Sequence, residues 1–255
     1  MTQKELFNIA LAQSAIDLNC TPEDLVSGQK TVVQSLPHPK ARAYLRLPFT
    51  CDLVSYGGGV VASVSPELRD IVTAYIEKYP VEHLFETPNL HALDDALAPH
   101  GLRTCFMAEY FLPDLQALKP LPCPYELRLL QPEDFKDLYL PQWSNALSDK
   151  RPHLDALAVG AYDGGTLIGL AGCSADCDTM WQIGMDVLPE YRRQGIASAL
   201  TSRLAIEILN RGKVPFYCAA WCNVKSVRNA IRSGFRPAWV EMTAKSCETV
   251  DGINK

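Results

Sequence analysis

The clearest feature of the sequence is a change of hydrophobic period between residues 180 and 210. Apolar residues first alternate with polar or small ones, which predicts a strand with two different faces. One face carries Trp181, Ile183, Met185 and Val187, and the other carries Gln182, Gly184 and Asp186. Apolar residues then recur every fourth position, at Ile196, Leu200, Leu204 and Ile208, which predicts a helix.

The loop between this strand and this helix has the chemistry of an anion site. Gly195 stands where the helix begins, and glycine lets a ligand approach the backbone closely. The first amides of a helix have no partner within the helix, so they are available to a negatively charged group. Arg192 and Arg193 precede the glycine, and their planar forks suit phosphate oxygens. The sequence therefore predicts a phosphate cradle here.

A second unit of the same kind follows directly. The helix ends at Arg211-Gly212, a common stop signal. A strand is predicted over 213–221, and a short helix follows Asn223 and closes before Gly234-Phe235. The order of strand, Arg-x-x-Gly-x-Ala loop, helix, strand, asparagine, helix and Gly-Phe resembles the GNAT superfamily of acyl-CoA-dependent N-acetyltransferases. The resemblance covers roughly residues 125–245, about half of the chain.

The resemblance implies an α+β fold whose mixed central sheet contains two splayed parallel strands flanked by helices. It also implies acetyl-CoA as the acyl donor, with its pyrophosphate held by the loop at Arg192, Gly195 and Ala197. The backbone amide of Val187 would contact the thioester carbonyl. The full set of expected cofactor contacts is Val187, Leu188, Arg192, Arg193, Gln194, Gly195, Ile196, Ala197, Ser198, Asn223 and Ser226. Asn223 has an alternative role as the N-cap of its helix.

Amide formation from an amine and a thioester needs a neutral amine, a stabilised oxyanion and a proton for the departing thiolate. Asp186 is the nearest carboxylate and is the expected catalytic residue, which would either pass the proton of the amine to water or hold the ammonium group before reaction. The alternative is a solvated aspartate at the end of a strand. Many GNAT members place a proton-donating tyrosine where this chain has Ala230. The acid is therefore left open among Tyr217, Cys222 and Ser226.

Two functions follow from these residues. The preferred one is an acetyltransferase that moves acetyl from acetyl-CoA to a primary amine of a small molecule, by direct attack in a ternary complex. Because Ala230 replaces the usual tyrosine, the alternative is a non-catalytic acyl-CoA-binding regulatory module.

A proline-rich seam predicts the domain boundary. Four prolines fall at Pro113, Pro120, Pro122 and Pro124, where they remove backbone donors and disfavour helix. We place the boundary near residue 122, which gives a smaller amino-terminal α/β domain over 1–122 and the GNAT-like domain over 123–255. In the second domain we expect a strand over 125–130, a helix over 132–147 broken at Pro141, and a hairpin around Asp163-Gly164-Gly165.

The amino-terminal half begins with a predicted helix over 3–17, capped by Thr2 and Glu5. A strand over 59–65 then enters a helix at Pro66, and a second helix and a strand over 103–111 follow. This order parallels the second half, so the first half is interpreted as a degenerate GNAT-like copy. It lacks the Arg-x-x-Gly-x-Ala loop, and a second cofactor site is not expected.

Composition and charge exclude some classes of protein function and location. The chain has 255 residues, of which 47% are hydrophobic, and a net charge of −5, which argues against a general nucleic-acid binder. Because no apolar run approaches about 18 residues and the amino terminus lacks an apolar signal core, we expect a cytoplasmic protein without a membrane partner. The nine cysteines are expected to be reduced thiols. Cys173, Cys177, Cys218 and Cys222 could in principle supply four thiolates to zinc. Because Cys218 and Cys222 would lie about 13 Å apart along a strand, no metal is expected. The sequence gives no indication of the oligomeric state.

Overall fold

The computed structural model describes residues 1–253, and the chain divides into two compact units. Unit 1 contains residues 1–9 and 111–237, and unit 2 contains residues 10–110 and the stretch from residue 238 onward. Strands β4 (Leu102–Pro113) and β10 (Phe235–Ser246) contribute residues to both units. Neither unit is contiguous in sequence, and the boundary placed near residue 122 stays a prediction.

Unit 1 is built on a mixed sheet in which the strands follow the order β9-β8-β7-β6-β5. The first four strands in sequence form an antiparallel meander, and β9 then pairs with β8 in parallel. Their bounds are β5 (Glu126–Leu130), β6 (Asp155–Asp163), β7 (Thr166–Ser174), β8 (Met180–Val187) and β9 (Val214–Ala220). The hairpin predicted around Gly164 is confirmed.

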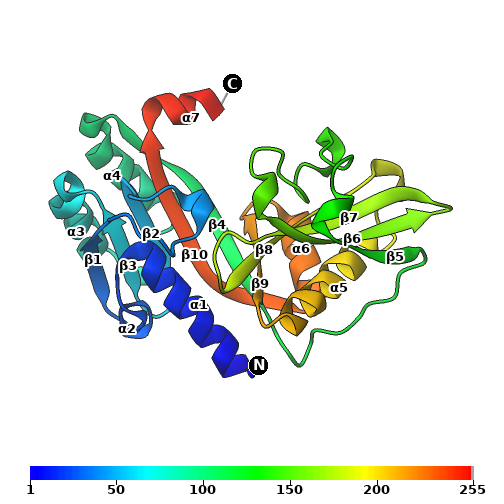
Figure 1. Cartoon of the computed structure of the whole chain (residues 1–255). Coiled ribbons are helices and arrows are strands. Elements are labelled where there is room, and N and C mark those ends of the chain that lie inside the picture. Colours follow the sequence, from blue (N-terminus) through cyan, green and yellow to red (C-terminus); the bar gives the residue numbers. More distant parts are fainter. Residues whose placement is uncertain (254–255) are drawn as a thin grey trace. The chain divides into compact units, whose positions relative to one another are not determined.

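Helix α5 (Ile196–Asn210) packs on this sheet, and α6 (Val224–Arg232) follows β9 (Figure 1). Both helices are where the hydrophobic period and their end signals predict them. The alternation along β8 is also confirmed, because Ile183 and Val187 lie in one core cluster with Leu200 and Leu204 of α5. The apolar face of β8 thus packs against α5 and leaves Gly184 and Asp186 on the other face.

Unit 2 contains strands in the order β1-β3-β2-β10-β4, where β1 pairs with β3 in parallel and β2 is antiparallel to both β3 and β10. Helices α3 and α4 cover one face of its sheet (Figure 1). That face carries an apolar core that includes Leu53, Ala62, Val72 and Leu93. The bounds are β1 (Lys30–Gln34), β2 (Cys51–Ser55), β3 (Val60–Val64), α2 (Pro22–Val26), α3 (Arg69–Lys78), α4 (Thr87–Leu97) and α7 (Cys247–Ile253).

The first helix, α1 (Gln3–Leu18), begins as predicted. The amide of Glu5 donates to Thr2 Oγ1 at 3.2 Å, and Glu5 Oε2 accepts from the amide of Thr2 at 2.7 Å. These two bonds form the expected capping box and satisfy amides that a helix start leaves without partners.

The helix expected over 132–147 is wrong. The structure has only two short 3-10 turns in this range, η5 (Pro132–Asp134) and η6 (Pro141–Trp143). After η6 the amide of Asn145 donates to the carboxylate of Asp186, 41 residues away in the sequence, rather than to a helical carbonyl. A distant acceptor has therefore replaced the local hydrogen bond on which a helix depends.

Two glycines make room for this segment. Gly172 of β7 and Gly184 of β8 are opposite each other in the sheet. A Cβ atom at Gly184 would come within 1.8 Å of the carbonyl oxygen of Asn145, and one at Gly172 within 2.1 Å of that of Ala146. Both distances are far inside van der Waals contact, so only glycine allows residues 145 and 146 to lie directly on these strands.

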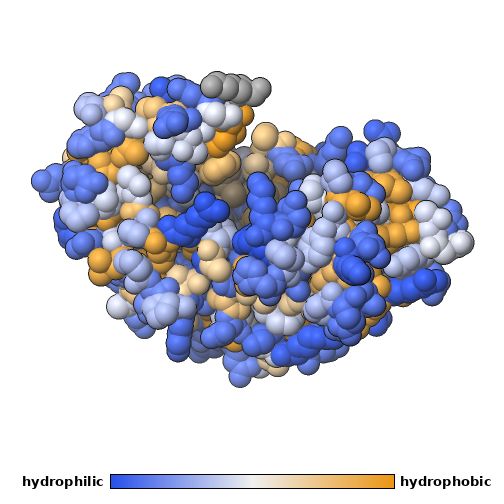
Figure 2. Space-filling view, turned by 45° about the horizontal axis from the view of Figure 1, so that its top comes forward, coloured by the Kyte–Doolittle hydropathy of each residue, from blue (hydrophilic) through white to orange (hydrophobic). Residues whose placement is uncertain are grey.

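Single large apolar side chains are exposed at several positions, including Phe106 (54%), Trp221 (44%) and Ile231 (54%). On the face shown in Figure 2, apolar residues appear in separate groups among hydrophilic ones. Scattered exposure of this kind is ordinary for a folded protein and indicates no particular partner.

Candidate functional site

Strands β8 and β9 pair over only part of their length. The parallel ladder runs from Met180 opposite Val214 to Ile183 opposite Tyr217. Both strands continue beyond this point, β8 to Val187 and β9 to Ala220, and these later residues are not paired with each other in the described chain. We call the residues after Ile183 in β8 and after Tyr217 in β9 the splayed ends. They agree with the expectation of two diverging parallel strands.

The backbone of Val187 faces this splayed side of β8. The amide of the next residue, Leu188, donates to the carbonyl of Ile168 on the β7 side at 3.0 Å. Because backbone groups of successive strand residues point to opposite edges, the N–H and C=O of Val187 point toward the β9 side. The carbonyl of Val187 there accepts a hydrogen bond from Arg192 Nε at 3.0 Å.

The loop after β8 passes through one short turn, η8 (Pro189–Tyr191), and enters α5 at Gly195. Gly195 has a φ of 83°, in the left-handed region that favours glycine, and no side chain caps the helix it begins. A Cβ atom built on Gly195 would meet no other group within 4 Å, so the space beside it is open. Arg192, Arg193 and Gln194 are exposed beside this space. An uncapped helix start, open space and two cations are the features that fit a pyrophosphate.

A neighbouring tyrosine fixes the loop, and sequence reasoning missed it. Tyr125 donates from its hydroxyl to Gln194 Oε1 at 2.8 Å, and its ring lies edge-on to that of Tyr191 at 5.7 Å between centroids. Tyr191 in turn donates to Asp163 Oδ2 at 3.0 Å. Tyr125 is 69 residues from its partner, so no local pattern could have indicated the contact.

Two of the expected cofactor contacts point their side chains elsewhere. Ile196 is buried in the core, and the hydroxyl of Ser198 donates to Asn229 Oδ1 at 3.1 Å inside the protein. Asn229 also donates to Thr201 Oγ1 at 3.0 Å, which ties α6 to α5. Ile196 and Ser198 can therefore reach a cofactor only through their backbone amides.

Asp186 is engaged on the opposite face of β8. Its Oδ2 accepts from the amide of Asn145 at 2.9 Å and from the amide of Ala146 at 3.1 Å, and its Oδ1 accepts from Asn145 Nδ2 at 2.6 Å. The carboxylate thus holds the segment after η6 against the sheet. Asp186 is half-buried, and the choice between its catalytic role and that of a solvated strand-end aspartate stays a prediction.

The residues of the second motif meet at the start of α6. Asn223 Oδ1 accepts from the amide of Ser226 at 3.2 Å and so acts as the N-cap of α6. The hydroxyl groups of Ser226 and Tyr217 share a hydrogen bond of 2.8 Å. Ala230 lies one turn beyond Ser226 on the same side of α6 and is fully buried, whereas Cys222 is exposed.

The Tyr217 hydroxyl has an altered acidity. Burial raises the pKa of Tyr217, and the bond with Ser226 acts in the opposite direction. The charge of Asp186 adds a smaller upward contribution to the pKa of Tyr217. The two side chains therefore act on one another electrostatically although they lie on opposite faces of the sheet.

Residues 1–253 contain no group of three or more His, Cys, Asp or Glu side chains that could hold a metal ion. Cys218 Sγ accepts a hydrogen bond from Gln182 Nε2 at 3.1 Å. In the same range, no helix combines the length and the apolar character that a bilayer span requires.

Comparison with known proteins places the site in a family. Residues 116–235 match the model of the acetyltransferase (GNAT) family. This part of the chain is a GNAT acetyltransferase domain. The match contains the splayed ends, the arginine loop and α6, and it covers only the last few residues of the predicted amino-terminal domain. The interpretation of that half as a degenerate copy stays a prediction.

Solved structures of the same family resemble the chain at low identity. A GCN5-related N-acetyltransferase from Kribbella flavida is 16% identical over 60% of this chain and 63% of its own length, with a TM-score of 0.48. A GNAT acetyltransferase from Colwellia psychrerythraea is 16% identical over 72% and 76%, with a TM-score of 0.46. The aminoglycoside N-acetyltransferase AAC(6')-Iy, solved with CoA, is 21% identical over 47% and 92%, with a TM-score of 0.35. No curated protein matches the chain.

The predicted fold class, a mixed α+β structure with a mixed sheet flanked by helices, is confirmed for the GNAT domain. The acetyltransferase class is supported by the family match. The individual site residues are not tested by that match, and their roles are taken up below as proposals.

Replacement of Arg192 by alanine tests the cofactor loop. The change should remove one or two charge-assisted hydrogen bonds to phosphate, which corresponds to about 5- to 150-fold weaker acetyl-CoA binding in calorimetry. Arg203→Ala is the matched control, because Arg203 is an exposed arginine farther along α5 that pairs with Glu207. Equal affinity of the two variants would place the phosphates elsewhere.

Proposed function

We propose that this protein is an acetyl-CoA-dependent N-acetyltransferase that acetylates a primary amine of a small molecule by direct attack in a ternary complex. The observation that carries the proposal is the position of an uncapped, arginine-flanked helix start directly after a strand whose parallel ladder ends early. The first feature suits a pyrophosphate, and the second leaves backbone groups free to pair with an extended pantetheine arm.

In this proposal the cofactor contacts follow the geometry of the loop. Arg192, Arg193 and the amides from Gly195 to Ser198 hold the pyrophosphate, with Gln194 positioned by Tyr125. The N–H of Val187, on the splayed side of β8, hydrogen-bonds the thioester carbonyl and stabilises the oxyanion that forms during attack. The residues that line the remaining arm are Leu188, Asn223 and Ser226. Acetyl-CoA supplies the activated acetyl group.

Asp186 is the proposed group for the acceptor amine. A carboxylate offers about four acceptor positions, and hydrogen bonds from Asn145 and Ala146 take three of them. One acceptor position is left. Through it the carboxylate can accept a hydrogen bond from the ammonium group of the substrate, orient that group and pass its proton to water. The same bonds fix the carboxylate in place, so it does not have to be ordered when the substrate arrives.

The function is tested by turnover. The purified protein should release free CoA thiol from acetyl-CoA in the presence of at least one member of a panel of small primary amines, and the product should be the N-acetyl amide by mass spectrometry. The alternative, a non-catalytic acyl-CoA-binding module, is suggested by Ala230 at the position of the usual tyrosine. Tight acetyl-CoA binding with no thiol release across the panel would favour that alternative.

The variant Asp186→Asn tests the amine site. A free alkylamine is mostly protonated at neutral pH, so loss of the carboxylate should lower turnover most at the lower end of the active pH range. Acetyl-CoA affinity should be retained. PH–rate profiles of both proteins on one accepted amine provide the measurement, and denaturant unfolding checks that the segment after η6 still folds. Matching profiles and rates would leave Asp186 with its structural role alone.

The departing thiolate needs a proton, and we propose that Tyr217 gives it. Attack of the amine nitrogen forms the C–N bond and breaks the C–S bond, and the sulfur takes the proton of the Tyr217 hydroxyl. The acylated nitrogen loses its extra proton to water, and the Tyr217 phenolate regains a proton from water through Ser226, which shares a hydrogen bond with it. Tyr217 stands at the last paired position of β9 and reaches the side of α6 that carries Ala230, so a strand tyrosine takes the place of a helix tyrosine.

Tyr217→Phe removes the hydroxyl and keeps the buried ring. We expect kcat to fall about 100-fold with little change in the KM for acetyl-CoA, because proton donation acts after binding. The control is Tyr75→Phe in unit 2, which also removes a buried hydroxyl, the one that donates to the carbonyl of Leu84 at 2.6 Å. Steady-state kinetics of the two variants decide the matter: equal kcat values would remove Tyr217 from the reaction.

A further inference from the structure

The second face of the unit 2 sheet carries a group of buried polar side chains. Asp52 of β2 is in register with Ser63 of β3 on one side and with Thr243 of β10 on the other. Glu241 lies two residues before Thr243, so the alternation of a strand places it on the same face. Asp52 is 1% exposed and Glu241 is 5% exposed. Three adjacent strands thus bring polar side chains together away from water.

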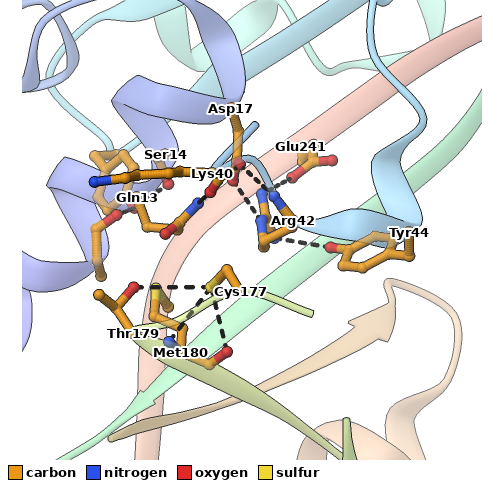
Figure 3. Close-up of polar contacts among 12 residues, drawn as sticks. Gln13, Ser14, Asp17, Lys40, Arg42, Tyr44, Cys177, Thr179, Met180 and Glu241 are labelled. Atoms are coloured by element: carbon orange, nitrogen blue, oxygen red, sulfur yellow. Dashed lines mark hydrogen bonds and ion pairs between the residues drawn. The ribbon is translucent and has the colours of Figure 1, made fainter. Parts of the chain in front are cut away.

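A single arginine connects this face to α1. Arg42 is 3% exposed, and its Nε donates to Asp17 Oδ2 of α1 at 2.5 Å while its amide donates to Asp17 Oδ1 at 2.8 Å (Figure 3). On its other side, Arg42 Nη2 lies 3.5 Å from Glu241 Oε2. Arg42 Nη1 also donates to the hydroxyl of Tyr44 at 2.8 Å. One guanidinium is therefore shared between a carboxylate of α1 and a carboxylate of β10.

Several oxygen atoms of this face have no hydrogen-bond partner. Both carboxylate oxygens of Asp52 are buried without one, and so are Ser63 Oγ and Thr243 Oγ1. Glu241 is better compensated, because its Oε2 has the ion pair with Arg42 and hydrogen bonds from Tyr110 and Arg42 lower the pKa of Glu241. An ionised Asp52 carboxylate in such surroundings is costly, because no side-chain or backbone donor hydrogen-bonds its two oxygens.

The groups that act electrostatically on Asp52 and Glu241 come from α1, β4, β10 and the segment that carries Arg42. They are Asp17 of α1, Arg42, Tyr110 of β4 and Lys245 of β10. Burial raises the pKa of Asp52 and of Glu241, and repulsion between the two carboxylates raises the pKa of Asp52 further. Arg42 opposes both shifts.

We propose that Asp52 and Glu241 hold a proton in folded unit 2, and that its loss to solvent at rising pH loosens α1 and Arg42 from the sheet. The device is a switch built from one shared guanidinium and two adjacent carboxyl groups. When the pair holds a proton, one of its carboxyl groups is neutral and can donate a hydrogen bond. When both groups are ionised, they carry two negative charges, which is more than Arg42 can neutralise because it also pairs with Asp17. Among the described residues, no group of three or more His, Cys, Asp or Glu side chains could hold a metal ion that would neutralise the two carboxylates instead.

The direction of the pH effect follows from linkage. Since the pKa of both carboxyl groups is raised in the folded state, folded unit 2 keeps protons that the unfolded chain has lost. The stabilisation is fully present below the ordinary carboxyl pKa of about 4 and disappears as the pH rises through the raised values. The equilibrium constant for opening should increase up to about tenfold per pH unit for each proton involved.

Hydrogen exchange of the full chain at pH values from about 5 to 9 tests the proposal, with rates corrected for the intrinsic pH dependence of exchange. In the native protein, peptides from β2, β10 and the end of α1 should open more readily as the pH rises. Asp52→Asn keeps the shape of the side chain and adds a donor but cannot release a proton, so this response should become flatter. Glu241→Gln should act in the same way and serves as a second variant if Asp52→Asn does not fold.

Asp155→Asn is the matched control in unit 1. Burial raises the pKa of Asp155 to about 6, so its removal should flatten the response of peptides around β6 and leave unit 2 unchanged. A pH response of unit 2 that is the same in the native protein and in both unit 2 variants would overturn the proposal. Recovery of protection at high pH on addition of Mg²⁺ or Ca²⁺ would also overturn it, because the carboxylates would then hold a cation rather than a proton.

Discussion

The early end of the ladder between β8 and β9 is the constraint on which the site depends. Parallel strands satisfy their backbone groups through each other, and here that pairing stops at Ile183 and Tyr217. The backbone of Val187 is left on the splayed side, within reach of Arg192, and α5 begins a few residues later without a side-chain cap. Unsatisfied donors and cations are thereby concentrated at one end of unit 1, where an anionic, extended cofactor would satisfy them.

The opposite face of β8 is constrained in a different way. Gly172 and Gly184 allow the segment after η6 to lie on the sheet, and the carboxylate of Asp186 fastens that segment through Asn145 and Ala146. Asp186 therefore combines a structural role with the proposed role in handling the amine. Such a combination is physically reasonable, because a carboxylate fixed by backbone donors is preorganised and still has a free acceptor position.

Local signals in the sequence predicted much of the fold. Helix α5, the hairpin at Gly164 and the start of α1 depend on period, turn residues and caps that lie within a few positions of one another. The helix expected over 132–147 was wrong, because the backbone amides of Asn145 and Ala146 donate to Asp186, which is distant in the sequence. The contact of Tyr125 with the loop and the pairing of β10 with β2 are non-local in the same sense, and hydrophobic pattern carries no information about them.

The central claim is that acetyl-CoA binds at the splayed end of β8 and the start of α5. Hydrogen exchange of the native protein with and without acetyl-CoA measures this directly, because bound phosphates and a paired pantetheine arm slow the exchange of the amides they contact. The account predicts strong protection of Val187 and of the amides from Arg192 to Ser198, with little change in unit 2. Unchanged exchange over these residues at saturating acetyl-CoA would contradict it.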